Sequence, residues 1–237
     1  MPDAVIAFFA LGLLAGLVKS DLKVPLPIYE TLSILLMLTL GLKGGMALHG
    51  VPLLPILPEL ALIAATGVAL PLLLYPLLRK LVQLSSANAA SVAAHYGSVS
   101  AGTFAVVVAY MTARGIEFES YMPLFVAILE IPASLVGILL AKGIARDTDW
   151  RALGREIFLG KSIMLLLGGL IIGAVAGKEA IKPLEPLYTS MFKPVLAFFL
   201  LEMGLIASGQ LGALKQFGVR LAAFALLMPL LGALIGA

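Results

Sequence analysis

Long apolar segments separated by short charged ones are the feature that most constrains this chain. Hydrophobic residues make up 61% of its 237 residues and charged residues only 12%, against about 45–50% and about 25% in soluble domains. A helix needs about 20 mostly apolar residues to cross a bilayer. The pattern therefore excludes a soluble globular protein, a disordered tail and a nucleic-acid-binding protein. It predicts an all-α polytopic protein of the cell membrane.

The charged residues separate eight predicted membrane spans, of which the first and the sixth are short. The spans cover residues 4–18, 27–48, 53–78, 81–113, 120–141, 162–177, 187–208 and 221–237. If the N-terminus is outside, the cytoplasmic loops carry eleven Lys or Arg residues and the outer loops only Arg114, Lys178 and Lys182. Because Lys and Arg collect on the cytoplasmic side, we expect the N-terminus to be outside.

The chain repeats itself at a nearly constant spacing. Gly12–Gly16 resembles Gly169–Gly173, Pro27–Tyr29 resembles Pro186–Tyr188, Leu40–Leu42 resembles Met203–Leu205, and Leu70–Leu73 resembles Met228–Leu231. The first unit, 1–142, has five predicted spans, so its copy would begin on the opposite side of the membrane after a cytoplasmic linker at 143–161. This pattern predicts an inverted-topology repeat, as in many secondary transporters; the alternative is a chance likeness of apolar helices.

The second unit, 162–237, contains only three predicted spans. By the logic of the repeat, two further spans would follow, which requires about 80 residues. We therefore expect ten spans in a complete protein, and we expect 1–237 alone not to transport.

The fourth predicted span is too long for one helix. Its 33 uncharged residues would extend about 50 Å at about 1.5 Å per residue. Its middle contains Gly97, Ser98, Val99, Ser100, Gly102 and Thr103. Glycine permits unwound backbone, and serine or threonine suits the N-cap of a helix that restarts. The alternative is a continuous helix with a packing face of small residues.

A broken helix in a membrane protein can hold ions of both signs. The restarted half would direct its N–H groups and its positive dipole end at an anion, while the first half offers carbonyl oxygens to a cation. We expect an anion at residues 97–103 and a sodium ion near Ser98, Ser100 and Thr103.

Carboxylates and Lys43 interrupt other spans. Glu130 lies at the centre of the fifth span beside Pro132. Because a carboxylate there is costly, it is either an ion ligand that supports the break or a protonated group bonded to a serine. Glu202 is expected to form a hydrogen bond near a helix end, and Lys43 is expected to extend to the outer interface.

Catalytic and cofactor motifs are absent from the sequence. It has no cysteine, its two histidines are far apart, and no phosphate-binding glycine loop is present. We therefore expect no enzyme and no cofactor other than sodium as a coupling ion.

Several of these segments resemble the sodium-dependent bicarbonate transporter family. The matching residues are Gly41–Ala47, Gly97 with Val99, Ser100 and Thr103, Ile131–Ala133, Leu200–Gly204 and Met228–Leu230. The resemblance implies ten spans in two inverted repeats, broken fourth and ninth helices that bind bicarbonate and sodium, a homotrimer, and a PII-like cytosolic regulator. Two positions differ from the family pattern: Ala101-Gly102 replaces Gly-Ser, and Glu130 replaces an aspartate.

The sequence thus predicts a sodium-coupled symporter that takes up a small inorganic anion, bicarbonate by resemblance. Two alternatives are an organic-anion symporter of the bile-acid type and a non-transporting membrane sensor.

Overall fold

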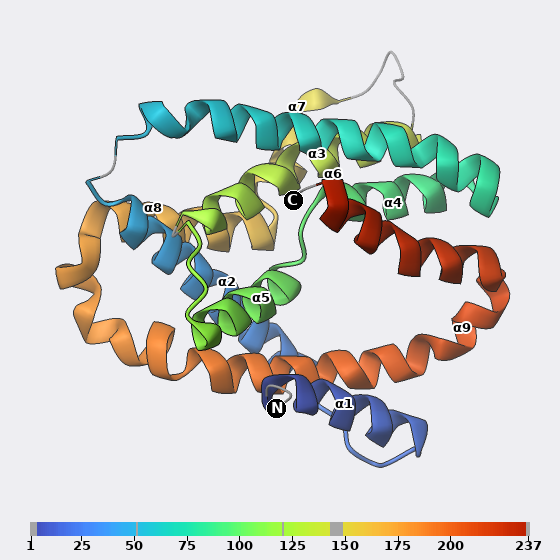
Figure 1. The fold of residues 1–237 in the computed structure, drawn as a ribbon, viewed down its shortest axis with the longest axis horizontal. Coiled ribbons are helices and arrows are strands. Elements are labelled where there is room, and N and C mark those ends of the chain that lie inside the picture. The colour runs from blue at the N-terminus through green and yellow to red at the C-terminus, as the bar shows by residue number, and fades with distance from the viewer. Residues whose placement is uncertain (1–3, 51, 120, 143–148, 236–237) are drawn as a thin grey trace.

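The computed structural model describes residues 4–50, 52–119, 121–142 and 149–235, and in these residues it is helical, with no strand (Figure 1). The α-helices are α1 (Ala4–Leu17), α2 (Leu26–Leu48), α3 (Leu57–Leu77), α4 (Ser86–Gly97), α5 (Ala101–Arg114), α6 (Met122–Lys142), α7 (Trp150–Phe158), α8 (Lys161–Ile181) and α9 (Phe192–Ile235). Short helical turns are η1 (Leu54–Ile56), η2 (Leu78–Val82), η3 (Lys182–Leu184) and η4 (Pro186–Ser190).

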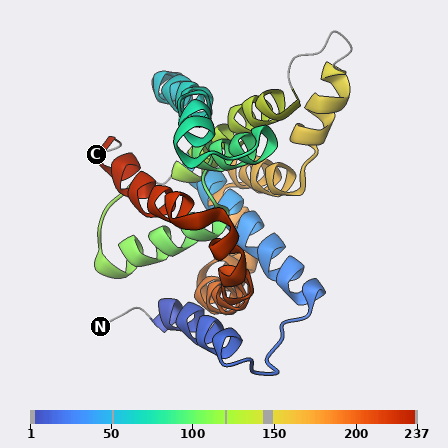
Figure 2. The ribbon, with the colours of Figure 1, turned by 90° about the vertical axis from the view of Figure 1, so that its right-hand side faces the viewer.

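The helices confirm a multi-pass membrane protein. Six helical segments are long and apolar enough to cross a bilayer, and two further apolar helices, Ala4–Leu17 and Gly218–Leu234, are shorter. Gly218 (φ 74°) divides α9 into two helices, and the second of these turns back over the molecule (Figures 1 and 2). The number of eight spans remains a prediction.

Glycines bring α2 and α8 into direct backbone contact. A Cβ atom on Gly41 would lie 2.4 Å from the carbonyl oxygen of Leu166, and one on Gly45 would lie 2.1 Å from that of Leu170. Gly169 and Gly173 of α8 face Gly41 and Gly45 in turn. Both helices advance in the same direction along this contact, so α2 and α8 are parallel.

The helices α1 and α9 form a second parallel pair of the same kind. Gly12 lies against the backbone of Leu201 and Leu205, and Gly204 lies against that of Phe9 and Leu13. One turn further, Gly16 contacts the Ser208 side chain. Two of the four pairs of repeated segments therefore supply glycines to these two contacts. Gly12 corresponds to Gly169, and Gly41 corresponds to Gly204.

A third group of helices consists of α3, α4 and α6. The methyl group of Ala94 in α4 occupies the space beside Gly137 of α6, and Pro132 of α6 packs on Gly67 of α3. The second part of α9 covers this group, because Leu221, Phe224 and Met228 pack against its buried side chains. Tyr96 and Phe224 meet edge to face, with ring centroids 5.5 Å apart.

Two segments differ from the sequence-based prediction. The fourth segment begins at Ser86 and not at residue 81, because residues 78–82 continue α3 as a π-helical turn that ends at Gln83 (φ 64°). In the linker, residues 143–148 lie outside the described part. Residues 150–158 form the helix α7, whose Ile157 packs on Ile163 and Leu135. This apolar contact packs α7 against α6 and α8.

The close contact of α2 and α8 predicts opposite effects at two adjacent glycines. Gly169→Ala places a methyl group 2.8 Å from the Leu38 carbonyl, whereas Gly168→Ala enters open space. We expect Gly169→Ala to lower the free energy of unfolding by about 1–3 kcal/mol through overpacking. Gly168→Ala should leave it unchanged or raise it by up to about 1 kcal/mol, because alanine favours helix. Thermal unfolding in detergent measures both, and equal effects would contradict the contact.

Candidate functional site

The candidate site lies where the helix formed by α4 and α5 is interrupted. Ser98, Val99 and Ser100 separate the two helices, and Ser98 (φ −120°, ψ 172°) and Ser100 (φ −63°, ψ 122°) have extended backbone. The interruption is where the sequence predicts it. Since the last carbonyl groups of α4 and the first N–H groups of α5 lack helical partners there, both kinds of polar group are available.

Ser100 caps the restarted helix. Its Oγ accepts a hydrogen bond from the backbone N–H of Thr103 at 3.4 Å, and its carbonyl accepts one from the N–H of Phe104 at 2.9 Å. The helix geometry leaves the N–H groups of Ala101 and Gly102 without an intrahelical acceptor. The Ser100 hydroxyl also keeps its own proton to donate. An anion at this end would meet backbone and hydroxyl donors together.

Three helices position the break. Gly97 is buried against Pro71 of α3 and Ala133 of α6, where a Cβ atom would lie 2.4 Å and 3.1 Å from their side chains. Gly102 is buried against the ring of Phe199 in α9. Phe199 is itself stacked on Tyr29 of α2, with centroids 5.5 Å apart. The glycines therefore allow neighbouring helices to approach both ends of the interruption.

The side chains between these glycines are more accessible. Ser98 is half-buried, whereas Val99, Ser100 and Thr103 are exposed. The predicted residues 97–103 thus lie together at the interruption. Gly97 and Gly102 are buried there, whereas the hydroxyl groups of Ser100 and Thr103 are exposed. Sequence reasoning missed Pro71, Ala133 and Phe199 as its supports. The first two lie in recurring or family-like segments, but nothing in the sequence marks Phe199.

Glu130 lies in α6 and lines a cavity that does not include the residues of the break. It lines a space of about 210 Å³ together with Ser134, Lys161 and Ser162, at the junction of α6, α7 and α8. Ala133, one turn further along α6, is the residue that contacts Gly97. The helix α6 therefore connects Glu130 to the break through the helix backbone and the Ala133 contact.

The break offers oxygen atoms that could hold a hard cation. No three His, Cys, Asp or Glu side chains come together in the part of the chain that the structure describes. The break offers carbonyl and hydroxyl oxygens instead, which are ligands of hard cations.

Of two other charged residues in the spans, Glu202 differs from its predicted setting. Glu202 lies inside α9, and among the described residues its buried Oε2 has no hydrogen-bond partner, so the predicted helix-end bond is wrong. The ammonium group of Lys43 lies over the ring of Phe192, 4.3 Å from its centroid. This cation–π contact stabilises Lys43 beside α9.

Comparison with known protein families shows to which family this chain belongs. The profile of the Na+-dependent bicarbonate transporter superfamily matches residues 4–237, nearly the whole chain. The chain belongs to this superfamily. The matched segment contains both parallel helix pairs and the interrupted helix. A search of curated proteins found no match.

The contact of Gly97 with Pro71 predicts that substitutions at these two residues have coupled effects on the free energy of unfolding. Gly97→Ala forces a methyl group against the rigid ring of Pro71, and we expect a loss of about 1–3 kcal/mol in unfolding free energy. Pro71→Ala in the same chain should recover most of that loss, because it removes the clashing ring. Thermal unfolding of the two single variants and the double variant gives the coupling. If the changes in unfolding free energy of the two single variants simply add in the double variant, Gly97 and Pro71 are not in contact.

Proposed function

We propose that this protein is a sodium-coupled symporter that takes up a small inorganic anion, most simply bicarbonate, and that it is not an enzyme. The observation that carries the proposal is the interruption of α4 and α5 at Ser98–Ser100 inside an apolar segment. Non-helical backbone at membrane depth is tolerated only inside protein or beside a watery cavity. Membership of the superfamily favours sodium and bicarbonate as the ions.

The groups at the break would bind the two ions in different ways. The N-terminal end of α5, with the donors of Ser100, Ala101 and Gly102 and the Thr103 hydroxyl, would bind the anion through N–H and O–H groups and the helix dipole. The C-terminal end of α4 and the hydroxyl groups of Ser98, Ser100 and Thr103 would hold sodium. Each ion offsets the charge of the other, so sodium raises the affinity for the anion by a coupling that is reciprocal.

The parallel helix pairs support an inverted repeat. Equivalent glycines make equivalent contacts in α1–α9 and α2–α8, and Figure 1 shows that one pair ends toward the left of the molecule and the other toward the right. Positive φ angles also recur after matching helices, at Lys19 and Gly177 and at Gly50 and Gly218. A pseudo-two-fold arrangement of this kind allows alternating access by rocking of one helix group against another.

The remaining parts of the proposal concern placement and partners. We place the protein in the cell membrane with its N-terminus outside, as a homotrimer that a PII-like cytosolic regulator can bind. An organic-anion symporter of the bile-acid type and a non-transporting sensor are the alternatives. Uptake of labelled bicarbonate into vesicles that contain the full-length protein, with and without a sodium gradient, separates all three.

The first prediction concerns the hydroxyl groups of Ser100, which caps α5, and of Thr103 in its first turn. Ser100→Ala and Thr103→Ala should each raise the bicarbonate concentration for half-maximal sodium-dependent uptake by about tenfold or more, since hydrogen bonds to charged groups contribute about 1.5–3 kcal/mol. Ser85→Ala is the matched control, because Ser85 caps α4 in the same way through Asn88. If all three variants behave alike, the break is a packing feature and the proposal fails.

The second prediction concerns Glu130. Glu130→Gln removes a charge with little change in volume, and we expect a higher sodium concentration for half-maximal uptake if the carboxylate stabilises the cation site through α6. Glu30→Gln, in the exposed first part of α2, is the control and should leave the sodium response unchanged. An unaltered sodium titration for Glu130→Gln would assign Glu130 a structural role as a protonated group.

A further inference from the structure

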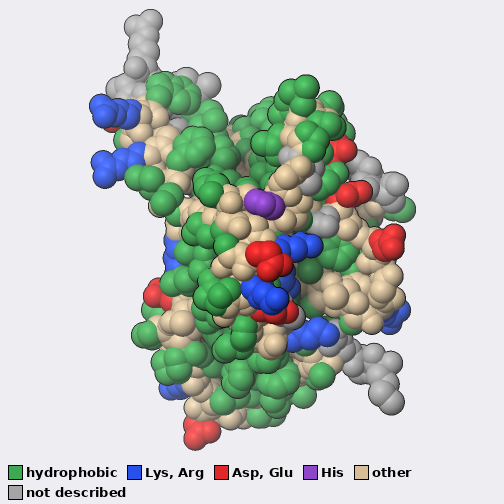
Figure 3. Space-filling view, turned by 90° about the vertical axis from the view of Figure 1, so that its left-hand side faces the viewer, with side chains coloured by type: hydrophobic (Ala, Val, Ile, Leu, Met, Phe, Trp, Pro, Cys, Tyr) green, Lys and Arg blue, Asp and Glu red, His purple; other side chains and the backbone are tan. Residues whose placement is uncertain are grey.

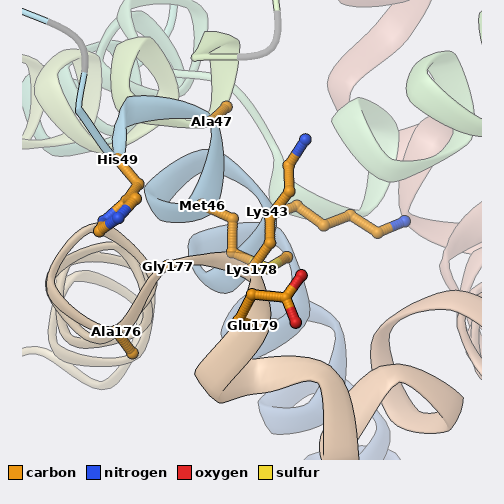
Figure 4. A pocket seen from close by; sticks show the side chains of 8 residues that line it. All are labelled: Lys43, Met46, Ala47, His49, Ala176, Gly177, Lys178 and Glu179. Carbon is orange, nitrogen blue, oxygen red and sulfur yellow. The ribbon is translucent and has the colours of Figure 1, made fainter.

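A separate cavity of about 620 Å³ lies where α2 ends and α8 bends. It is lined by Lys43, Met46, Ala47 and His49 from one segment and by Ala176, Gly177, Lys178 and Glu179 from the other (Figure 4). Seen from this end, the molecule has basic and acidic side chains around a histidine on an otherwise largely hydrophobic surface (Figure 3). The cavity is distant in sequence from the break and shares no lining residue with it.

Cationic groups outnumber acidic ones in this cavity. Lys43 and Lys178 bring two ammonium groups to the cavity, and Glu179 is the carboxylate among the lining residues. The ring of Phe192 covers the ammonium of Lys43 from one side. An aromatic face occupies only part of the ammonium's hydrogen-bonding surface, so Lys43 keeps N–H donors for a ligand. Among the described residues this half-buried ammonium has no carboxylate partner, so it is a ready contact for an anion.

The backbone fixes the shape of the cavity. Gly177 (φ 67°, ψ 179°) interrupts α8, a conformation that favours glycine. The bend brings Lys178 and Glu179 to the cavity beside Lys43, and the side chain of Met46 extends between them (Figure 4). His49 Nδ1 donates a hydrogen bond to the carbonyl of Ala174 at 2.7 Å, since a carbonyl can only accept. This bond joins the end of α2 to α8 across the cavity.

Lys43 also connects this cavity to a second one. A space of about 200 Å³ is lined by Leu40, Lys43, Val108 and Thr112, of which the last two belong to α5. The ammonium therefore lies between the wide cavity and the side of the half-helix that begins at the break. A ligand held at Lys43 would lie next to α5 without contacting Ser100 or Thr103.

We propose that the cavity between the end of α2 and the bend of α8 is a second anion site, which binds a small dissolved oxyanion through Lys43 and Lys178. Bicarbonate, sulfate and phosphate share the required chemistry of a compact negative charge with several acceptor oxygens. With the N-terminus outside, the site would face the exterior and raise the local anion concentration at the entrance. Its binding chemistry does not depend on the site at the break.

Because the chain has no cysteine, a single engineered thiol reports on this cavity directly. In Met46→Cys, we expect an anionic methanethiosulfonate reagent to react faster than a cationic one by on the order of tenfold, after correction for their rates with a free thiol. Lys43→Gln and Lys178→Gln should each reduce this ratio severalfold. Lys182→Gln is the matched control and should preserve it, because Lys182 is exposed in η3 and does not line the cavity.

Competition between dissolved anions and the anionic reagent identifies the kind of ligand that the cavity binds. Bicarbonate or sulfate should slow the anionic reagent in Met46→Cys at constant ionic strength, and Lys43→Gln should abolish this protection. Equal rates for the two reagents, or no protection by any dissolved anion, would overturn the proposal. Protection by added anionic phospholipid alone would also overturn it, because the occupant would then be a lipid headgroup. The assay needs no transport, so its result is independent of the Ser100 and Thr103 test.

Discussion

Backbone-to-backbone contact between glycine-bearing helices is the interaction on which the rest of this structure depends. In a bilayer the lipid tails are as apolar as leucine, so helices associate through close packing rather than through burial from water. Gly41 and Gly45 meet Gly169 and Gly173, and Gly12 meets the backbone beside Gly204. These contacts place α2 beside α8 and α1 beside α9, and they fix the position of Phe199 on α9 and of Lys43 on α2.

The interrupted helix follows from that framework. An unwound segment in an apolar environment leaves polar backbone groups to be satisfied, and it persists only where neighbours hold its ends. Here Pro71 and Ala133 press on Gly97, and Phe199 presses on Gly102, so three helices from distant parts of the chain enclose the interruption. The same supports leave Ser100 and Thr103 exposed. The break therefore combines rigid ends with reachable donors, which is what selective ion binding requires.

The two anion sites that we propose differ in their chemistry. At the break, the donors are backbone N–H groups and hydroxyls, which bind an anion without a fixed counter-charge and can couple it to sodium. At the cavity beside Gly177, the donors are the ammonium groups of Lys43 and Lys178, which attract any compact oxyanion. A weakly selective cationic site near a selective neutral one would raise local anion concentration without competing for the same atoms.

Local residue patterns were enough to predict a large part of this structure. The apolar segments predicted helices long enough to span a membrane, the serines and glycines at 97–103 predicted the interruption, and the repeated glycines predicted matched helices. All of these depend on local chemistry: hydropathy, the conformational freedom of glycine and the capping preference of serine. Such properties act over a few neighbouring residues and are therefore legible in the sequence.

Only the tertiary structure decided which distant residues meet. It placed Glu130 in one cavity with Lys161 and Ser162, left Glu202 Oε2 without a partner among the described residues, and set Lys43 over Phe192. It also packed 150–158 against α6 and α8, where Ile157 finds apolar neighbours. Each outcome depends on how one helix is rotated and displaced against another. That geometry is set by the sum of many weak contacts across the whole bundle, which no local pattern contains.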